Sequence, residues 1–276
     1  MISQDIFSSI FIIPVVNALV VLYRAFLALS LPGSFGLAIV ALTAGVRLAM
    51  HPLFVKQMDT QKKMSDLKPH LDRIGKKHKE DPRKLQAEQM RIYKEAGLNP
   101  ASGCLLIIVQ MPIFIGLYNA LSKLLTHGSG QDVVDGINNV LYMPWMRISA
   151  IDPFFLGFNL ALSPQQAGVW YYYLVPVITA ALQYFQTVFT MRMNPISKPV
   201  VEDEKSGKKG KKEEKKDNGM GDFQQIMNTQ MKYIFPIMIG WFAFTLPVGM
   251  SLYWNIFSIF SIVQYRKMAA QTAPTA

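Results

Sequence analysis

Long uncharged stretches alternate with charge-dense segments along this chain, and this segregation constrains its fold more than any other feature. The stretches 103–125, 169–191 and 231–265 hold almost no charge, whereas 56–99 and 192–229 hold most of it. Apolar runs of about 18 or more residues are long enough to cross the hydrocarbon core of a bilayer as helices. The pattern therefore predicts an all-α polytopic membrane protein.

The basic residues predict how the spans are oriented. The formal net charge is +10, and the 28 Lys and Arg residues concentrate in the two charge-dense segments and near the C-terminus. Lys and Arg accumulate in cytoplasmic loops, so we expect a multi-pass membrane protein with its N-terminus outside and its C-terminus in the cytoplasm. The charge then reflects topology and contact with anionic headgroups of the lipid bilayer, and we expect no DNA partner.

Five spans follow from the apolar runs and from the turn signals between them. Pro32-Gly33 and Pro52 bound the first span, and Pro247 to Gly249 divides the last run into two helices. The predicted segments are 1–34 on the outer side, span 35–55, cytoplasmic helical hairpin 56–103, span 104–125, outer loop 126–168, span 169–191, charged and partly disordered cytoplasmic loop 192–230, spans 231–247 and 248–266, and cytoplasmic tail 267–276. Helices of about 16 residues rise about 24 Å, less than the hydrocarbon core of about 30 Å, which predicts local thinning of the bilayer.

Residues 6–31 are apolar but contain Asn17 and Arg24, which fall on one face of a helix. If this segment crossed the membrane, its N-terminus would lie in the cytoplasm without Lys or Arg to hold it there. We therefore favour an interfacial amphipathic helix on the outer side over a span. The outer loop carries aromatic residues that we expect at the membrane interface: Trp145, Phe154, Phe155 and Phe158.

The hairpin 56–103 carries clear helix signals. Asp81-Pro82 predicts an N-cap followed by proline at the first helical position, and Gly97 with Asn99-Pro100 ends the second helix. Pro52 and Pro100 should interrupt the helices at the two roots of the hairpin and tether it loosely. By contrast, the run 202–217 is too polar to fold.

Arg47 is the most informative residue, because a charge near the centre of a bilayer costs about 2.5–3.5 kcal/mol on insertion scales. The predicted spans contain no Asp or Glu to pair with it. Snorkelling to the inner surface is one alternative, and a hydrated cavity open to a ligand is the other. Polar residues on several spans could line such a cavity or form helix-to-helix hydrogen bonds: Thr43, Gln110, Gln183, Gln186, Ser251, Asn255 and Ser258.

Signals for catalysis are absent from the sequence. The four histidines are scattered, the single cysteine is Cys104, and no nucleotide-binding or hydrolase motif occurs. We expect a protein that is not an enzyme and that needs neither metal nor cofactor. The methionines Met58, Met64 and Met90 offer an adaptable apolar surface for client proteins, with ordinary helix packing as the alternative.

Residues 35–125 and 169–267 resemble the YidC/Oxa1/Alb3 family of membrane protein insertases. The matching pattern comprises Arg47, Pro52-Leu53, Lys56-Gln57-Met58, Asp81 to Lys84, Tyr93-Lys94, Asn99-Pro100, Gly103-Cys104 and Gln110-Met111-Pro112. The resemblance implies five transmembrane helices around a hydrophilic groove with a central arginine, open to the cytoplasm and to lipid. It also assigns Thr43, Gln186 and Trp254 to the groove. Two positions depart from the pattern, His51 in place of an aromatic or aliphatic residue and Leu106 in place of proline.

The family resemblance implies a chaperone-like insertase that threads transmembrane segments of nascent membrane-protein clients into the bilayer. The ribosome and the Sec translocon are further candidate partners. A small transporter or channel could also use an intramembrane arginine, and a scaffold that recruits ribosomes could use the basic hairpin. Within the groove, the expected work of Arg47 is electrostatic, whereas Ile39 on the same helix is expected to face lipid.

Overall fold

The computed structural model describes residue 6 and residues 8–78, 81–99, 111–112, 114–119, 130–193 and 229–271 of the 276-residue chain. Gln110, Cys104 and Leu106, as well as the run 202–217, lie outside these residues. The predictions made for them are therefore not tested by the fold.

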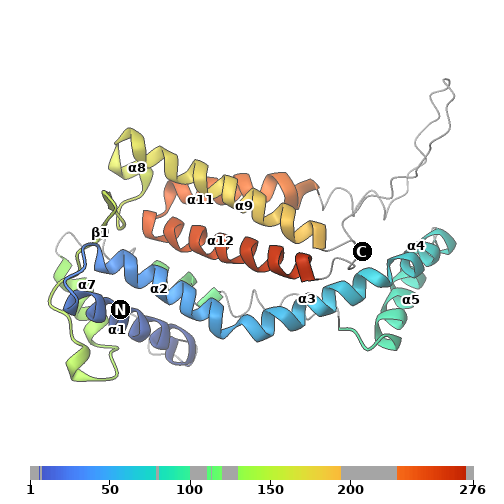
Figure 1. Cartoon of the computed structure of the whole chain (residues 1–276), viewed down its shortest axis with the longest axis horizontal. Coiled ribbons are helices and arrows are strands. Elements are labelled where there is room, and N and C mark those ends of the chain that lie inside the picture. Colours follow the sequence, from blue (N-terminus) through green and yellow to red (C-terminus); the bar gives the residue numbers. More distant parts are fainter. Residues whose placement is uncertain are drawn as a thin grey trace.

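The described chain is almost entirely helical (Figure 1). Its α-helices are α1 (Ile13–Ala28), α2 (Ser34–Ala49), α3 (His51–Asp66), α4 (Lys68–Lys77), α5 (Pro82–Glu95), α7 (Gly130–Asn138), α8 (Pro164–Ala167), α9 (Leu174–Met193), α11 (Phe235–Thr245) and α12 (Val248–Gln271). Residues 111–112 and 114–119 are helical as well. π-helical turns precede α1 (Ser8–Ile12) and α11 (Gln230–Ile234), and 3-10 turns lie at Pro144–Met146 and Trp170–Tyr173. Strands β1 (Phe154–Phe155) and β2 (Phe158–Asn159) pair in antiparallel fashion.

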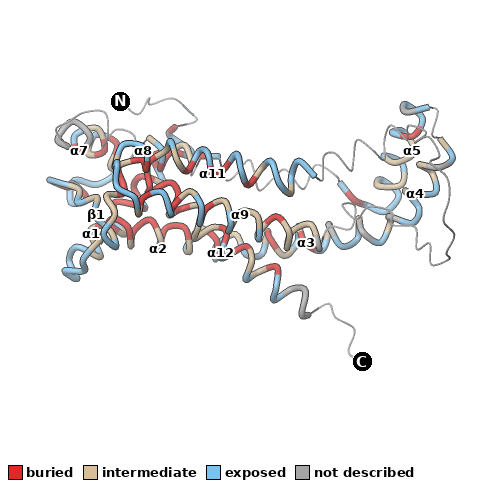
Figure 2. Tube along the Cα trace, turned by 90° about the horizontal axis from the view of Figure 1, so that it is seen from above, coloured by how far each residue is buried: buried red, intermediate tan, exposed pale blue. Residues whose placement is uncertain are grey.

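The body of the molecule is a layer of long helices. α9 packs along both α11 and α12, α2 packs along α12, and α1 packs on α2. Buried residues gather in this body, whereas the arm that leads through α3 to α4 and α5 is mostly exposed (Figure 2). Ile39 of α2 belongs to the body's buried apolar cluster with an exposed fraction of 0%. The expectation that Ile39 faces lipid is wrong, because α2 turns this face toward its neighbours.

Two described helical segments are long and apolar enough to cross a membrane, Ser8–Ala28 and Trp170–Met191. Ser34–Ala49 and His51–Met64 meet the same criterion as a bent pair. These segments make the chain a membrane-embedded helical protein. The count of five spans and the inside–outside orientation stay predictions.

The helix breaks between α2, which ends at Ala49, and α3, which begins at His51, directly before Pro52. The two axes differ by 53°, and Pro52 is the second residue of α3, where its missing N–H leaves no hydrogen bond unmade. Phe54 N donates to Met50 O at 3.0 Å across the bend. The expected break in helical continuity near Pro52 is therefore confirmed, and α3 continues from His51 to Asp66 beyond it. The loose tethering of the hairpin stays a prediction.

The helix signals around α5 are confirmed. Asp81 caps the helix by accepting a hydrogen bond from Lys84 N at 3.0 Å, and Pro82 occupies the first turn. Gly97 follows the helix with φ of +66°, a conformation that favours glycine. α4 and α5 pack against each other. Tyr93 is half-buried, and this burial raises the pKa of its phenol.

Asn17 is the centre of the contact between α1 and the outer segment that follows α7. Its side chain is 3% exposed; its amide donates to Ile13 O and to Val140 O, at 2.8 and 2.9 Å, and accepts from Tyr142 N at 2.8 Å. Arg24 donates to Trp145 O and to Arg147 O. The polar face read as amphipathic thus packs on protein instead of facing headgroups, while the interfacial position of α1 stays a prediction.

The predicted outer loop has secondary structure of its own. It contains α7, the β-hairpin and α8, and Trp145 and Phe154 are 60% and 56% exposed as expected of interfacial aromatic residues. Phe155 instead packs so closely on α2 that a Cβ on Gly36 would lie 2.2 Å from its ring. Only glycine fits there, because any side chain would clash with the ring.

The break between α11 and α12 is confirmed near its predicted place. Leu246 is extended, with φ of −92° and ψ of 159°, and α12 begins after Pro247. The first turn of α12 is held to the outer segment, because Val248 N and Gly249 N donate to Leu162 O and Leu160 O. α12 continues to Gln271, so it runs past the predicted end of the fifth span at 266.

Candidate site around Arg47

Arg47 lies in the last turn of α2 and is 6% exposed. Its side chain crosses to α12, and the alternative of snorkelling to the inner surface stays a prediction. Thr43, one turn earlier, is 2% exposed and donates to Ile39 O at 2.7 Å. α2 therefore presents Arg47 to α12 from a well-packed helix.

Three acceptors on α12 hold the guanidinium of Arg47. Nη2 donates to Phe257 O at 3.3 Å and to the hydroxyl of Ser261, and Nη1 donates to Gln264 Oε1 at 3.5 Å. The guanidinium carbon also lies 3.5 Å from the centroid of the Phe257 ring, a cation–π contact. All of these partners are neutral, and α2, α9, α11 and α12 contain no Asp or Glu. The positive charge of Arg47 is consequently not neutralised by its neighbours in the helical body.

Buried polar atoms without hydrogen-bond partners gather in the same body of helices. Among the described residues, the buried side-chain atoms that lack a partner are Arg47 Nε, Gln186 Oε1, Ser251 Oγ, Tyr253 OH and Asn255 Oδ1. They come from α2, α9 and α12. Buried polar atoms in proteins almost always have a partner, either protein or water, so each of these atoms is suited to contact with water or with a polar group of a ligand.

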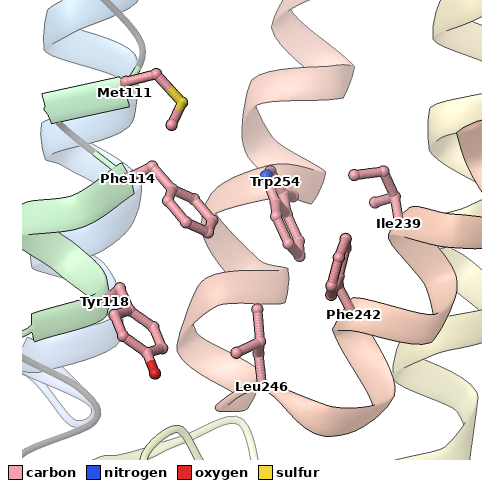
Figure 3. Close-up of a pocket in the computed structure, with 7 residues that line it drawn as sticks. All are labelled: Met111, Phe114, Tyr118, Ile239, Phe242, Leu246 and Trp254. Carbon is pink, nitrogen blue, oxygen red and sulfur yellow. The ribbon is translucent and has the colours of Figure 1, made fainter.

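An apolar cavity of about 460 Å³ lies beside this region, between residues 111–119 and α11 (Figure 3). Its lining is aromatic and aliphatic: Met111, Phe114, Tyr118, Ile239, Phe242, Leu246 and Trp254. Trp254 of α12 projects between the two walls and stacks on Phe114 with ring centroids 5.5 Å apart. α12 therefore contributes to both surfaces, the polar contacts of Arg47 and this apolar cavity.

Comparison with known proteins decides the family. The sequence profile of the 60Kd inner membrane protein family matches residues 26–273. The chain belongs to this family, the YidC/Oxa1/Alb3 family. The resemblance drawn from the motif pattern around Arg47 is thereby confirmed.

Several relatives in this family cover most of the chain. Membrane protein insertase YidC of Oceanobacillus iheyensis is 30% identical over 96% of this chain and 85% of its own length. The chloroplastic inner membrane ALBINO3-like protein 2 of Chlamydomonas reinhardtii is 32% identical over 85% of this chain, which spans 49% of that protein. Membrane protein insertase YidC 1 of Listeria monocytogenes is 29% identical, and the match spans 63% of its length. The chain thus corresponds to part of the longer family members.

The residues predicted to line a family groove fall into two groups. Ser251 and Ser258 are buried, at 0% and 2% exposed, and with Gln186 and Asn255 they belong to the polar interior of the helical body. Gln183 is half-buried on α9. Trp254 lines the apolar cavity and not the polar region.

The sequence pattern missed the residues that contact Arg47 most directly. Ser261 and Gln264 continue the polar stripe that was read only as far as Ser258, because each follows at a spacing of three residues. The helical spacing could have identified both. Phe257 contributes its backbone carbonyl and its ring, and the backbone contact leaves no sequence signal.

The three methionines predicted to contact clients differ in exposure. Met58 is 3% exposed and packs with Phe54 and Tyr265, so the alternative of ordinary helix packing accounts for it. Met64 is half-buried on α3, and Met90 on α5 is 40% exposed. A client-contacting role stays a prediction for Met64 and Met90. Within the described part of the chain, no group of three or more His, Cys, Asp or Glu side chains is placed to hold a metal ion.

Proposed function

We propose that this chain is a membrane protein insertase that moves the polar flank of a client helix through a hydrated, lipid-open groove centred on Arg47. Family membership and the similarity to the YidC membrane protein insertases support this proposal. One structural observation carries it for this chain. The guanidinium of Arg47 is buried against neutral acceptors, and no acid among the described residues pairs with it.

The energetic problem is the transfer of polar residues across about 30 Å of hydrocarbon. Unpartnered polar atoms from three helices favour water in the groove, because each such atom left dry costs about 1–3 kcal/mol. Water and a fixed positive charge lower the cost of an entering acidic tail. Arg47 would attract the tail electrostatically, since the neutral acceptors on α12 leave its charge intact.

The apolar cavity between residues 111–119 and α11 supplies the other half of the proposed path. Its aromatic lining suits the apolar part of a client helix that leaves the groove for lipid. Burial of about 20 apolar residues in the bilayer then drives the step without nucleotide hydrolysis. Trp254 stands at the proposed junction, since it belongs to the same helix as the partners of Arg47.

The arm of α3, α4 and α5 is the proposed recruiting element on the cytoplasmic side. Its basic, exposed surface suits anionic headgroups or the ribosome, and the Sec translocon is a further candidate partner. This assignment places the N-terminus outside and the C-terminus in the cytoplasm of the bacterial plasma membrane. The clients in this proposal are nascent membrane proteins, and neither catalysis nor a cofactor takes part.

Insertion into liposomes that contain only the purified chain tests this function. The client is a single-span protein with an acidic N-terminal tail, and a matched client carries Asn and Gln in place of the acids. Arg47→Ala should lower insertion of the acidic client about tenfold and spare the neutral one, because the lost charge-assisted contacts contribute about 1.5–3 kcal/mol. Arg47→Lys should retain most of the activity, since the charge remains.

The matched control is Arg147→Ala, which removes an exposed arginine from the outer segment and should leave insertion of both clients unchanged. If folded Arg47→Ala inserts the acidic client as fast as the unmodified chain, the electrostatic role is wrong. If the unmodified chain inserts neither client, the insertase function itself fails. Ion or solute flux without insertion would favour a transporter or channel.

A further inference from the structure

His51 and Gln264 form a contact that the proposed insertion path does not use. Gln264 Nε2 lies 3.4 Å from His51 Nδ1, and Gln264 Oε1 accepts from Arg47 Nη1 at 3.5 Å. His51 is the first residue of α3, directly after the bend from α2. One amide side chain therefore joins the start of the α3 arm to the guanidinium in the body.

The direction of these hydrogen bonds follows from the chemistry of the three groups. Arginine has only donors, so the oxygen of the Gln264 amide must face Arg47. The NH₂ group of Gln264 then faces His51, and Nδ1 of His51 must act as acceptor. In this arrangement Nδ1 of His51 carries no proton. The chain of contacts thus has a single consistent orientation.

Packing next to this contact fixes where His51 stands. Phe54 and Met58, both 3% exposed, lie on the first two turns of α3 and pack against Tyr265 of α12. The rings of Phe54 and Tyr265 meet edge to face with centroids 5.2 Å apart. Because Tyr265 directly follows Gln264, this small apolar cluster holds the start of α3 beside the Gln264 amide.

We propose that Gln264 is a positioning residue for Arg47 and that His51 Nδ1 anchors the Gln264 amide. Ser261 and Phe257 both bind Nη2, whereas Gln264 binds Nη1. Without Gln264 the guanidinium keeps its hydrogen bonds at Nη2 and its contact with the Phe257 ring, but Nη1 loses the hydrogen bond that fixes its direction toward α12. The effect of Gln264 on the insertion of acidic clients rests on the proposed function, but the orientation of the Arg47 side chain can be measured without any client.

The test uses phenylglyoxal, a dicarbonyl that condenses with both terminal nitrogens of an arginine, on the full chain in liposomes. Mass spectrometry of the Arg47 peptide gives its rate of modification, normalised to the rate at exposed Arg91 on α5. Gln264→Met and His51→Leu should each raise the Arg47 rate about threefold, a change suited to long, weak contacts. The double variant should not exceed the larger single effect, because both remove the same restraint.

Two control variants separate positioning from general loosening of the fold. His51→Asn keeps an acceptor where Nδ1 stood and should leave the Arg47 rate unchanged, as should Gln165→Met on the exposed surface of α8. An unchanged rate in Gln264→Met overturns the proposal. A raised rate in Gln264→Met but not in His51→Leu overturns the anchoring role of His51. These outcomes do not depend on whether Arg47→Ala impairs insertion, so the two proposals fail separately.

Discussion

The region around Asn17 and the region around Arg47 both bury polar side chains, but they treat them differently. Asn17 makes three hydrogen bonds that join α1 to the outer segment. Nearby, Tyr23 OH donates to Ala150 O and accepts from Asp152 N, and the Asn138 amide binds both backbone groups of Ile148. In the helices α2, α9 and α12, five buried polar atoms, one of them Arg47 Nε, have no partner among the described residues. The outer region is closed by its own hydrogen bonds, whereas the body around Arg47 is not.

This difference separates buried polar groups that are paired within the protein from buried polar groups that are free to bind water or a client. A paired buried amide contributes about 1 kcal/mol per hydrogen bond and specifies one arrangement of the chain. An unpaired one costs about 1–3 kcal/mol, so its retention suits a site that exchanges partners with water and passing polar groups. On this account, the Asn17 region seals the outer side and the Arg47 region receives the client.

The largest expected effect comes from α4 and α5, which belong neither to the region around Asn17 nor to the region around Arg47. Replacing residues 67–96 by a Gly-Ser linker removes α4 and α5 but keeps the packing of Phe54 and Met58 on α12. Insertion of ribosome-delivered clients should be abolished, because the proposed recruiting surface is gone, while Asn17 and Arg47 keep their surroundings. Raising the salt concentration should likewise weaken the recruitment of clients by the unmodified chain, because salt screens exposed charges.

Deletion of 202–217 is the matched control for that experiment, since this run is also rich in charge. It should cost little insertion activity. If this deletion abolishes insertion and the linker variant is active, recruitment belongs to the charged loop and not to α4 and α5.

A smaller effect should distinguish the two polar regions by stability. Asn17→Leu leaves the backbone groups of Val140 and Tyr142 without their partner and should lower the free energy of unfolding by about 3 kcal/mol. Asn255→Leu removes an amide whose oxygen is unpartnered and should lower it by less than about 1 kcal/mol. SDS titration in mixed micelles, followed by circular dichroism, measures both. Equal losses in the two variants would remove the distinction between paired and available groups.

Local signals predicted much of the fold correctly. The Asp81 cap and the break near Pro247 depend on a few neighbouring residues. The apolar length of residues 169–191 predicted a helix that is long enough to span. Such features are independent of how one helix is rotated against another.

Features that depend on the rotation and contacts of whole helices could not be predicted in the same way. Ile39 and Met58 are apolar residues on predicted helices, and the sequence does not say which neighbour covers them. The polar face that contains Asn17 suits contact with lipid headgroups as well as with the backbone of a distant segment. In the structure, Asn17 contacts the backbone of Val140. The partners of Arg47 on α12 required the crossing of α2 and α12, which brings residues 210 to 217 positions apart into contact.

Water accessibility of the body around Arg47 tests the central claim most directly. Cys104 is first replaced by alanine, and single cysteines are placed at Gln186, Asn255, Phe185 and Asn17 for reaction with a membrane-impermeant maleimide in native membranes. Gln186 and Asn255 carry unpartnered oxygens. Phe185, the residue before Gln186 on α9, is 53% exposed. Asn17 belongs to the region whose polar groups are paired. The account predicts that cysteines at Gln186 and Asn255 react and that those at Phe185 and Asn17 do not; equal labelling at all four positions, or labelling at Phe185 alone, would contradict it.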